Sequence, residues 1–372
     1  MSLQTRRIPL SKPFVDDREE ELLLEVLHSG RFSLGPMIDR FEQAFAERVG
    51  SAHAAAVSSG TAGLDLCVRL AGLGPGDEAI TSPFSFVASA NCIIYAGASP
   101  VFADIDPRTL NLDTDAVEAA VTERTRAVVA VDIFGYPCEL EPLRALCERH
   151  GLTLIEDACE ALGAEYRGRP VGSHGHPAVF AFYPNKQMTT GEGGMVSTDS
   201  DEVWSVLKSL SNQGRADFGG WLEHARLGYN YRLSDFAAAL GVAQLEKLDR
   251  MLDLRAQAAA RYGELLAGVD GIEPPLADDT DHRRSWFVYV VKLAPEVDRE
   301  RVIATLEAEG VASSRYLPSI HLQPYMRERF GFQEGMLPSS EGASRRTLAL
   351  PFFTQIADED LERVVDVLRR AL

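Results

Sequence analysis

The sequence predicts an α/β protein with a mostly parallel central sheet, and two observations support this prediction. From residue 53 onward, short apolar runs alternate with helical patterns, which is the rhythm of βαβ units in a parallel sheet. The runs are almost continuously apolar, as expected of strands that helices cover on both faces. This pattern changes toward the C-terminus, so we expect a large α/β domain over residues 1–250 and a small α+β domain over residues 251–372.

Two helices are expected before the sheet begins. The first spans residues 16–28, where acidic residues crowd the start, apolar residues recur on one side and Gly30 can end the helix. The second begins at Pro36, carries one apolar stripe and ends at Gly50. These helices form an N-terminal helical segment of the large domain.

The rest of the chain divides into short strands and intervening helices. Strands are expected over residues 53–57, 99–105, 127–134, 152–157, 178–183 and 194–198, and helices over residues 61–72, 85–96, 113–122 and 139–150. The C-terminal region is expected to contain a long helical pattern over residues 234–267, a loop over 271–281, a strand over 285–293 and helices over 300–309 and 358–371. Ligands of such sheets bind beyond the carboxyl ends of the strands, so candidate site residues are sought there.

Composition and charge exclude several classes of function. The 372 residues include 37 Lys and Arg against 55 Asp and Glu, a net charge of −18, so we expect no general attraction to nucleic acid or to an anionic membrane. No stretch approaches the roughly 20 apolar residues of a membrane-spanning helix. The five cysteines lie far apart and form no C-x-x-C pair. We therefore expect reduced thiols, a cytoplasmic location and no metal site.

Two side chains that can take part in catalysis lie at the ends of buried strands. Lys186, in FYPNKQMTTGEGG, comes directly after a strand, where a partly desolvated lysine can form a Schiff base. The alternative for Lys186 is an ordinary solvated loop lysine. Asp157 ends the strand in LTLIEDACEALG, where it can pair with a positively charged ring, or else cap the next helix.

Two further motifs lie at strand-to-helix junctions. SSGTAGL, at residues 58–64, opens a helix whose free N–H groups can bind an anion, although ordinary helix capping explains the motif as well. SPFSFVASAN, at residues 82–91, offers Phe84 or Phe86 as a stacking ring, although either ring can belong to the core. Pyridoxal phosphate needs a Schiff-base lysine, an acid at its ring nitrogen, a phosphate cradle and a flat contact. The four motifs together predict this cofactor.

The motifs resemble those of the DegT/DnrJ/EryC1/StrS family, pyridoxal-phosphate-dependent sugar aminotransferases of fold type I. The resemblance covers almost the whole chain and is carried by HSGRFSLGPMIDRFE, SSGTAGLDL, GPGDEAITSPFSFVASANCI, PVFADIDPRTLNLD, IEDACEALGAEYRG, FYPNKQMTTGEGGMVSTD, LGYNYRLSDFAAALGVAQLEKLD and SIHLQPYM. It implies transfer of the amino group of L-glutamate to a keto-sugar nucleotide, a 3- or 4-keto hexose or pentose. A family branch with His in place of the lysine dehydrates sugars, and Lys186 argues against that branch.

The resemblance also implies a role for each site residue. Lys186 would form the internal aldimine and later move the proton, and Asp157 would bind the ring nitrogen of the cofactor. Gly60 and Thr61 would hold the phosphate, and Phe86 would stack on the ring. Contacts with the acceptor would come from Arg31, Phe32, Tyr316 and His321.

By the same resemblance, Asn230 in GYNYR would reach the phosphate of the neighbouring subunit, which implies a homodimer with shared active sites. Two other positions depart from the family pattern. Glu160 stands at a cofactor-binding position where many members carry Gln, and its charge would repel the cofactor's phenolic oxygen unless Glu160 is protonated or turned away. Ala181 stands where many members carry Ser, which removes one hydroxyl from the phosphate site.

Three alternatives stand beside this prediction. Nicotinamide-dependent oxidoreductases share the βαβ rhythm, but no G-x-G-x-x-G motif follows the first strand. A non-catalytic regulator that binds pyridoxal phosphate would be free to lose Lys186 or Asp157, and both are present. The third alternative keeps the chemistry but uses a cyclitol or another non-nucleotide ketone, such as an aminobenzoate precursor. The sequence does not separate this third alternative from a keto-sugar nucleotide.

Overall fold

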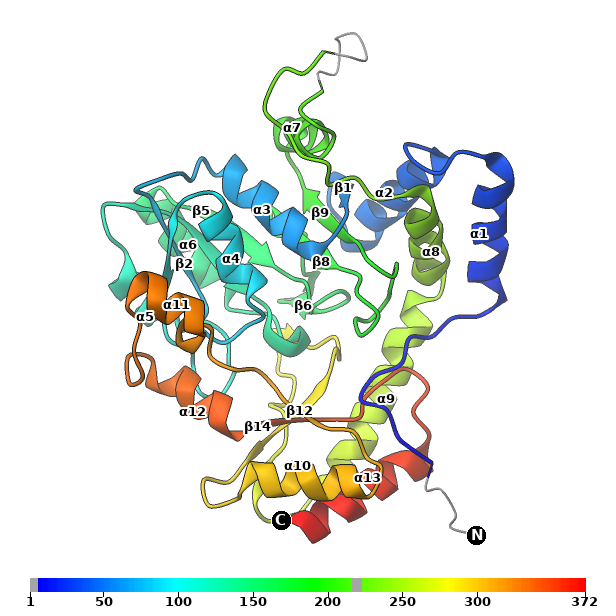
Figure 1. Cartoon of the computed structure of the whole chain (residues 1–372), viewed down its shortest axis with the longest axis vertical. Coiled ribbons are helices and arrows are strands. Elements are labelled where there is room, and N and C mark those ends of the chain that lie inside the picture. Colours follow the sequence, from blue (N-terminus) through cyan, green and yellow to red (C-terminus); the bar gives the residue numbers. More distant parts are fainter. Residues whose placement is uncertain (1–5, 216–222) are drawn as a thin grey trace.

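A seven-stranded sheet forms the centre of the computed structural model, which describes residues 6–215 and 223–372 (Figure 1). Its strands are β1 (His53–Val57), β2 (Glu78–Thr81), β3 (Ser99–Phe102), β4 (Thr125–Val131), β5 (Thr153–Asp157), β8 (Ala178–Ala181) and β9 (Gly194–Thr198). The order is β1-β9-β8-β5-β4-β2-β3, and all neighbours pair in parallel except those of β9, which is antiparallel to β1 and β8. The predicted α/β class with a mostly parallel sheet is confirmed.

Helices cover both faces of this sheet, which explains why its strands are mostly buried. On β4, Val129 packs in a cluster with residues of α3 (Gly60–Leu70), α4 (Ala88–Tyr95) and α7 (Asp201–Ser211). Its neighbours Val128 and Ala130 point to the other face, into a cluster with residues of α5 (Thr114–Ala120) and α6 (Leu140–His150). Alternating side chains of one strand thus serve two cores.

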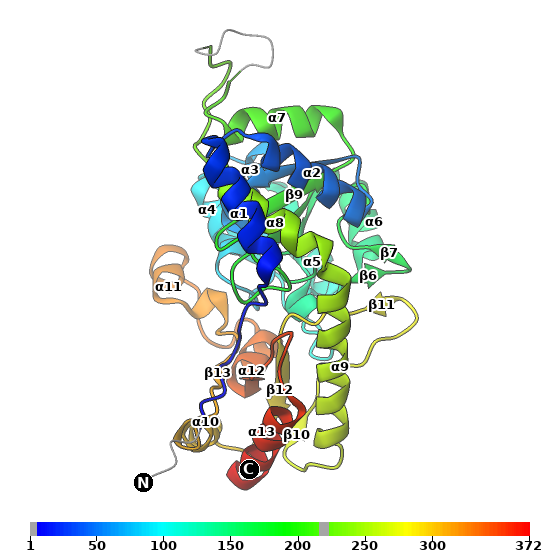
Figure 2. The same ribbon diagram turned by 90° about the vertical axis from the view of Figure 1, so that its right-hand side faces the viewer.

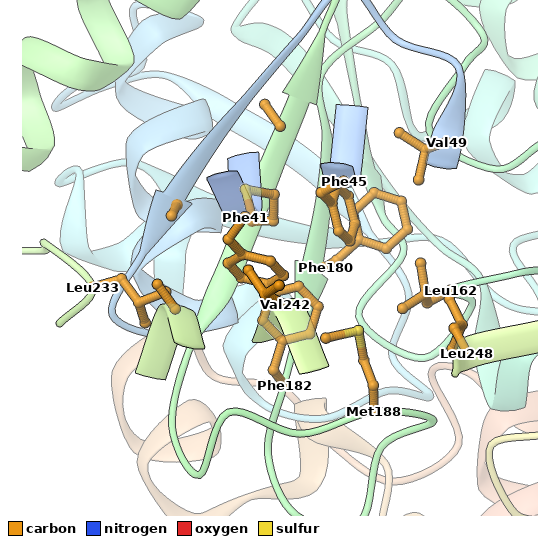
Figure 3. Close-up of a cluster of buried hydrophobic side chains, with 14 of the residues drawn as sticks. Phe41, Phe45, Val49, Leu162, Phe180, Phe182, Met188, Leu233, Val242 and Leu248 are labelled. Atoms are coloured by element: carbon orange, nitrogen blue, oxygen red, sulfur yellow. The ribbon is translucent and has the colours of Figure 1, made fainter. Parts of the chain in front are cut away.

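The N-terminal helices pack on the second face beside β8, and Figure 3 shows part of the hydrophobic cluster between them. These helices are α1 (Asp17–Ser29) and α2 (Pro36–Val49), and α8 (Asp235–Glu246) lies against both. Phe41 of α2 contacts Phe182 with ring centroids 5.5 Å apart, and Phe45 contacts Phe180 at 5.0 Å. Phe182 and Met188 are both buried in this cluster, so it anchors both ends of the loop that carries Lys186.

The C-terminal part is a four-stranded sheet against helices (Figure 2). The sheet order is β10 (Ile272–Glu273), β12 (Tyr289–Leu293), β14 (Thr347–Leu350) and β13 (Ser314–Arg315), and its helices include α9 (Leu248–Leu266), α10 (Arg299–Ala308) and α13 (Asp358–Ala371). Ile8, near the N-terminus, packs in the same hydrophobic cluster and hydrogen-bonds with the backbone of Gly310 and Ala312.

The remaining elements are short. They are β6 (Glu165–Tyr166), β7 (Arg169–Pro170) and β11 (His282–Arg283), which form a small sheet, the helices α11 (Pro324–Phe330) and α12 (Pro338–Arg346), and the 3₁₀ turns Ile133–Gly135 and Ile320–Leu322. Within residues 6–215 and 223–372, no helix is both long enough and apolar enough to span a bilayer.

Several predicted boundaries were wrong for identifiable reasons. The helical pattern of residues 234–267 is two helices, because the backbone leaves the helical region at Lys247, whose ammonium pairs with Glu19. The strand predicted over 285–293 begins only at Tyr289, since the backbone carbonyls before it accept hydrogen bonds from side chains of other elements. Strand β2 and helix α7 had not been predicted.

Candidate active site

A cavity of about 590 Å³ opens where the parallel strands end. The last residues of β4, β5 and β8, which are Val131, Asp157 and Ala181, all lie on its wall. Of the residues predicted for the site, those that line this one cavity are Gly60, Thr61, Phe86, Asp157, Glu160, Lys186 and Tyr316. The carboxyl edge of the sheet therefore gathers residues that are up to about 250 positions apart, as expected for an open α/β sheet.

Lys186 lies in the loop after β8 and has only 13% of its side chain exposed. Its Nζ is 3.4 Å from Oε1 of Glu160 and 4.0 Å from the centre of the Phe287 ring. The backbone N–H of Lys186 donates to the carbonyl of Tyr183 at 2.9 Å, which closes the loop. A lysine that is buried at a cavity wall in this way differs from the solvated loop lysine of the alternative interpretation.

Asp157 is 5% exposed and is held by a serine from another element. Its Oδ2 accepts a hydrogen bond from the Ser89 hydroxyl at 2.6 Å, and Ser89 lies 2.8 Å from the hydroxyl of Ser85. Its Oδ1 accepts the backbone N–H of Cys159 at 3.3 Å. Ser89, in the first turn of α4, was not among the predicted site residues, and no motif of the sequence signals its contact with Asp157.

The N-terminus of α3 forms another part of the wall. Ser59 caps this helix by accepting the N–H of Ala62 at 3.1 Å, and Gly60 is the first helical residue. A side chain at Gly60 would place its Cβ 2.7 Å from Cβ of Ala181 and 2.8 Å from Sγ of Cys159. The helix start is therefore packed tightly against the sheet, with its first N–H groups, which have no intrahelical partner, at the cavity wall.

Phe86 contributes a ring to the cavity. It lies between β2 and α4 and is 62% exposed, although a large aromatic side chain is more often buried. Phe84, two residues earlier, is fully buried and packs against Phe134. The structure therefore separates the two candidates, since Phe84 belongs to the core and only Phe86 presents a ring to the cavity.

Glu160 is buried beside Lys186. Its Oε2 accepts the backbone N–H of Phe134 at 2.9 Å, while Oε1 faces Lys186. Burial raises the pKa of Glu160, and the positive charge of Lys186 opposes this effect. Tyr316 lines the cavity as well, and burial together with the charge of Glu160 raises the pKa of its hydroxyl.

Four predicted residues do not line this cavity. His321 is 0% exposed, its Nε2 lies 3.1 Å from Oε1 of Glu341, and its ring packs against aromatic neighbours. Arg31 donates to the carbonyl of Leu34. The other two, Phe32 and Asn230, are exposed. Within this chain, the structure places these side chains outside the cavity that holds Lys186.

The sequence pattern of the DegT/DnrJ/EryC1/StrS aminotransferase family matches residues 13–369. The chain belongs to this family. The spore coat polysaccharide biosynthesis protein SpsC of Bacillus subtilis (strain 168) is 39% identical over 375 residues, which cover 97% of this chain and 96% of SpsC. The structure of S. venezuelae DesV is 34% identical, covers 98% of each chain and superposes with a TM-score of 0.92.

Another solved structure of similar fold shows the cofactor of this family. Spr1654 from Streptococcus pneumoniae in its PLP form is 26% identical, covers 98% of each chain and has a TM-score of 0.93. The residues of the present chain fit that cofactor, because the tight start of α3 offers N–H groups for a phosphate and Phe86 offers an exposed ring. The chain is therefore a pyridoxal-phosphate-dependent aminotransferase of fold type I within the DegT/DnrJ/EryC1/StrS family.

Proposed function

We propose that the chain transfers the amino group of L-glutamate to the keto group of a nucleotide-linked sugar, a 3- or 4-keto hexose or pentose. The observation that carries this proposal is the cavity of about 590 Å³, which unites Lys186, Asp157, Phe86 and the start of α3. The similarity to SpsC, a spore coat polysaccharide biosynthesis protein, supports a sugar as acceptor. Lys186 and Asp157 are the catalytic residues of this proposal.

Each residue contributes through its position in the cavity. When bound, pyridoxal phosphate supplies an electron sink for the carbon atom that gains or loses the amino group. Lys186 is the residue that we expect to bind the cofactor covalently and to move the proton afterwards. Asp157, held by Ser89, would face the cationic ring nitrogen with its carboxylate, and the first N–H groups of α3 would hold the phosphate.

The proposal includes a homodimer in which Asn230 acts in the cavity of the partner. Asn230 is exposed, and its backbone forms an isolated β-bridge with Asn212, the residue that ends α7. It does not line the cavity of its own chain, so a role in phosphate binding requires a second copy. Ala181 offers no hydroxyl at the phosphate site, which leaves more of this work to α3 and Asn230.

The acceptor is identified by following the nitrogen atom. The cofactor-loaded protein is incubated with ¹⁵N-labelled L-glutamate and, in separate reactions, nucleotide-linked 3- and 4-keto hexoses, keto pentoses and a cyclitol ketone. We expect ¹⁵N in a nucleotide-linked amino sugar, detected by mass spectrometry, with release of 2-oxoglutarate. Labelling of the cyclitol alone would overturn the nucleotide-sugar proposal, and cofactor binding without any amino transfer would favour the regulator.

A further inference from the structure

The contact between Glu160 and Lys186 allows a proton to move between the two side chains, a role not included in the proposed function. The side chains are 9% and 13% exposed, and the atoms Oε1 and Nζ lie 3.4 Å apart. A buried carboxylate and ammonium at this distance can exist as an ion pair or, after transfer of one proton, as a neutral acid and a neutral amine. The two forms contain the same number of protons.

Three segments fix the geometry of this contact. Phe134 and Gly135 have left-handed backbone conformations, with φ values of 55° and 79°, and this turn directs the N–H of Phe134 to Oε2 of Glu160. The side-chain amide of Gln187 donates to the carbonyl of Glu160 at 2.6 Å. The guanidinium of Arg255, from α9, donates to the carbonyl of Lys186 at 3.2 Å. The carboxylate of Glu160 and the backbone of both residues are thus held in place.

The other titratable groups that face Glu160 do not compete for its proton. Asp157 adds negative charge, which together with burial raises the pKa of Glu160. Burial raises the pKa of Cys159 well above its ordinary value, and burial also raises the pKa of Tyr316, so the thiol and the phenol keep their protons at neutral pH. Lys186 is therefore the group that can exchange a proton with Glu160.

We propose that Glu160 accepts, directly from Nζ of Lys186, the proton that this lysine gives up when it becomes a nucleophile. The N–H bond breaks and leaves its electron pair on nitrogen, while an O–H bond forms at Oε1, so that ammonium and carboxylate become neutral amine and neutral acid. No further reactant is needed. The inference rests on the proposed covalent role of Lys186 and makes Glu160 its proton acceptor.

This transfer also explains how Glu160 can stand where many family members carry Gln. An ionised Glu160 would repel an anionic oxygen in the cavity, whereas the neutral acid has an O–H group that can donate a hydrogen bond to such an oxygen. Proton transfer therefore removes the positive charge of the lysine and the negative charge of the acid in one step. Glutamate can then occupy a position where the family often carries glutamine.

The test measures how fast the apoprotein fixes its cofactor on Lys186 at different pH values. Apoprotein is mixed with pyridoxal phosphate, quenched with borohydride at set times, and the modified peptide is quantified by mass spectrometry. Wild type is compared with Glu160→Gln. The matched control is Glu42→Gln, since Glu42 is also a buried carboxylate paired with a lysine, Lys208 at 2.6 Å, and does not line the cavity.

In wild type the lysine passes its proton within the pair, whereas Glu160→Gln must release it to solvent. We therefore expect the rate of the variant, divided by that of wild type, to fall about tenfold per pH unit as the pH is lowered from about 9 to about 6. The ratio for Glu42→Gln should not change with pH. A pH-independent ratio for Glu160→Gln would overturn the inference. No cofactor fixed on Lys186 of wild type would instead overturn the proposed function.

A second measurement needs no variant and no cofactor. The apoprotein is acetylated briefly at each pH, and the modification of Lys186 is compared with that of Lys12, which is exposed in the same chain. Transfer within the pair predicts that the ratio of Lys186 to Lys12 modification rises about tenfold for each unit by which the pH is lowered. Parallel loss of reactivity at both lysines would contradict proton transfer to Glu160.

Discussion

Asp157 depends on a residue that lies 68 positions earlier in the chain. The short hydrogen bond from Ser89 fixes the carboxylate at the cavity wall, and Ser85 supports Ser89 in turn. A hydrogen bond to a charged group contributes about 1.5–3 kcal/mol, more than one between neutral groups. Ser89 is therefore a positioning residue for Asp157.

Replacement of Ser89 tests this role. Ser89→Ala should lower kcat/KM by about tenfold or more, because the carboxylate loses its donor and a fixed orientation. The matched control is Ser340→Ala, which removes another buried serine–serine hydrogen bond, the 2.9 Å contact with Ser319. The kcat/KM of each variant is measured by steady-state kinetics with the same acceptor. Equal effects of the two variants would contradict the positioning role.

At the residue scale, the sequence was informative where a side chain directly follows a buried strand. Lys186 and Asp157 could be predicted because β8 and β5 end beside them at one sheet edge. Ser89 contacts Asp157 from α4, an element distant in the sequence, and the pattern of the segment does not show this contact. His321 was expected near the acceptor, but it packs internally with Glu341, a pair separated by 20 residues and an intervening helix.

At the element scale, the start of α3 decides whether the phosphate site can form. The backbone at Gly60 approaches Ala181 and Cys159 so closely that a side chain has no room. We expect Gly60→Ala to weaken cofactor binding by at least about tenfold, since overpacking costs about 1–3 kcal/mol and shifts the helix N-terminus. Equilibrium dialysis with pyridoxal phosphate measures the effect.

A second glycine in a helix provides the control. Gly263, in α9, has no atom within 4 Å of an added Cβ. Gly263→Ala should leave the cofactor Kd unchanged and stabilise the protein by about 0.5–1 kcal/mol. The same loss of affinity in both variants would show that the fit at Gly60 is not the reason.

The ends of β4 and β5 contain a buried acidic pair that makes stability depend on pH. Burial and the charge of neighbouring Glu156 raise the pKa of Asp132 well above its ordinary value. Asp132 therefore keeps its proton in the folded protein at pH values above about 3.9, where the unfolded chain has released it. As the pH rises from there toward the folded-state pKa, the free energy of unfolding falls. Glu156 in turn accepts from His176 at 3.0 Å.

Asp132→Asn should remove this dependence. The free energy of unfolding of wild type, minus that of the variant, should fall by up to about 1.4 kcal/mol per pH unit as the pH rises from about 4 to 7. Urea unfolding at several pH values measures the difference, with the exposed Asp270→Asn as control. A difference that stays constant over this range would show that Asp132 carries no extra proton in the folded state.

Helices and strands could be predicted where burial and periodicity agree, but not where contacts with distant residues determine their bounds. Strands β1 and β9 match their predicted bounds, because both faces of each are buried. Strand β2 has only two apolar residues between buried polar ends, too short a pattern to recognise. The sequence of residues 285–287 is typical of a strand, but their backbone carbonyls accept hydrogen bonds from the side chains of Gln187 and Arg255.

At the scale of the whole molecule, the proposed shared site predicts complementation between subunits. Lys186→Ala and Asn230→Ala are each expected to impair activity, the second most clearly at low cofactor concentration. After unfolding and refolding together in equal amounts, about a quarter of the sites should combine an intact Lys186 with an intact Asn230 from the partner. Activity that stays at the sum of the separate variants would contradict the shared site.

The most direct test of the central claim is the visible absorbance of the protein with pyridoxal phosphate, before and after L-glutamate. We expect a band of lysine-bound cofactor in wild type, lost on addition of glutamate as the cofactor takes up the amino group. Lys186→Ala should show neither the lysine-bound band nor catalytic turnover. Substantial transamination by Lys186→Ala, or the absence of any lysine-bound band in wild type, would contradict the assignment of Lys186.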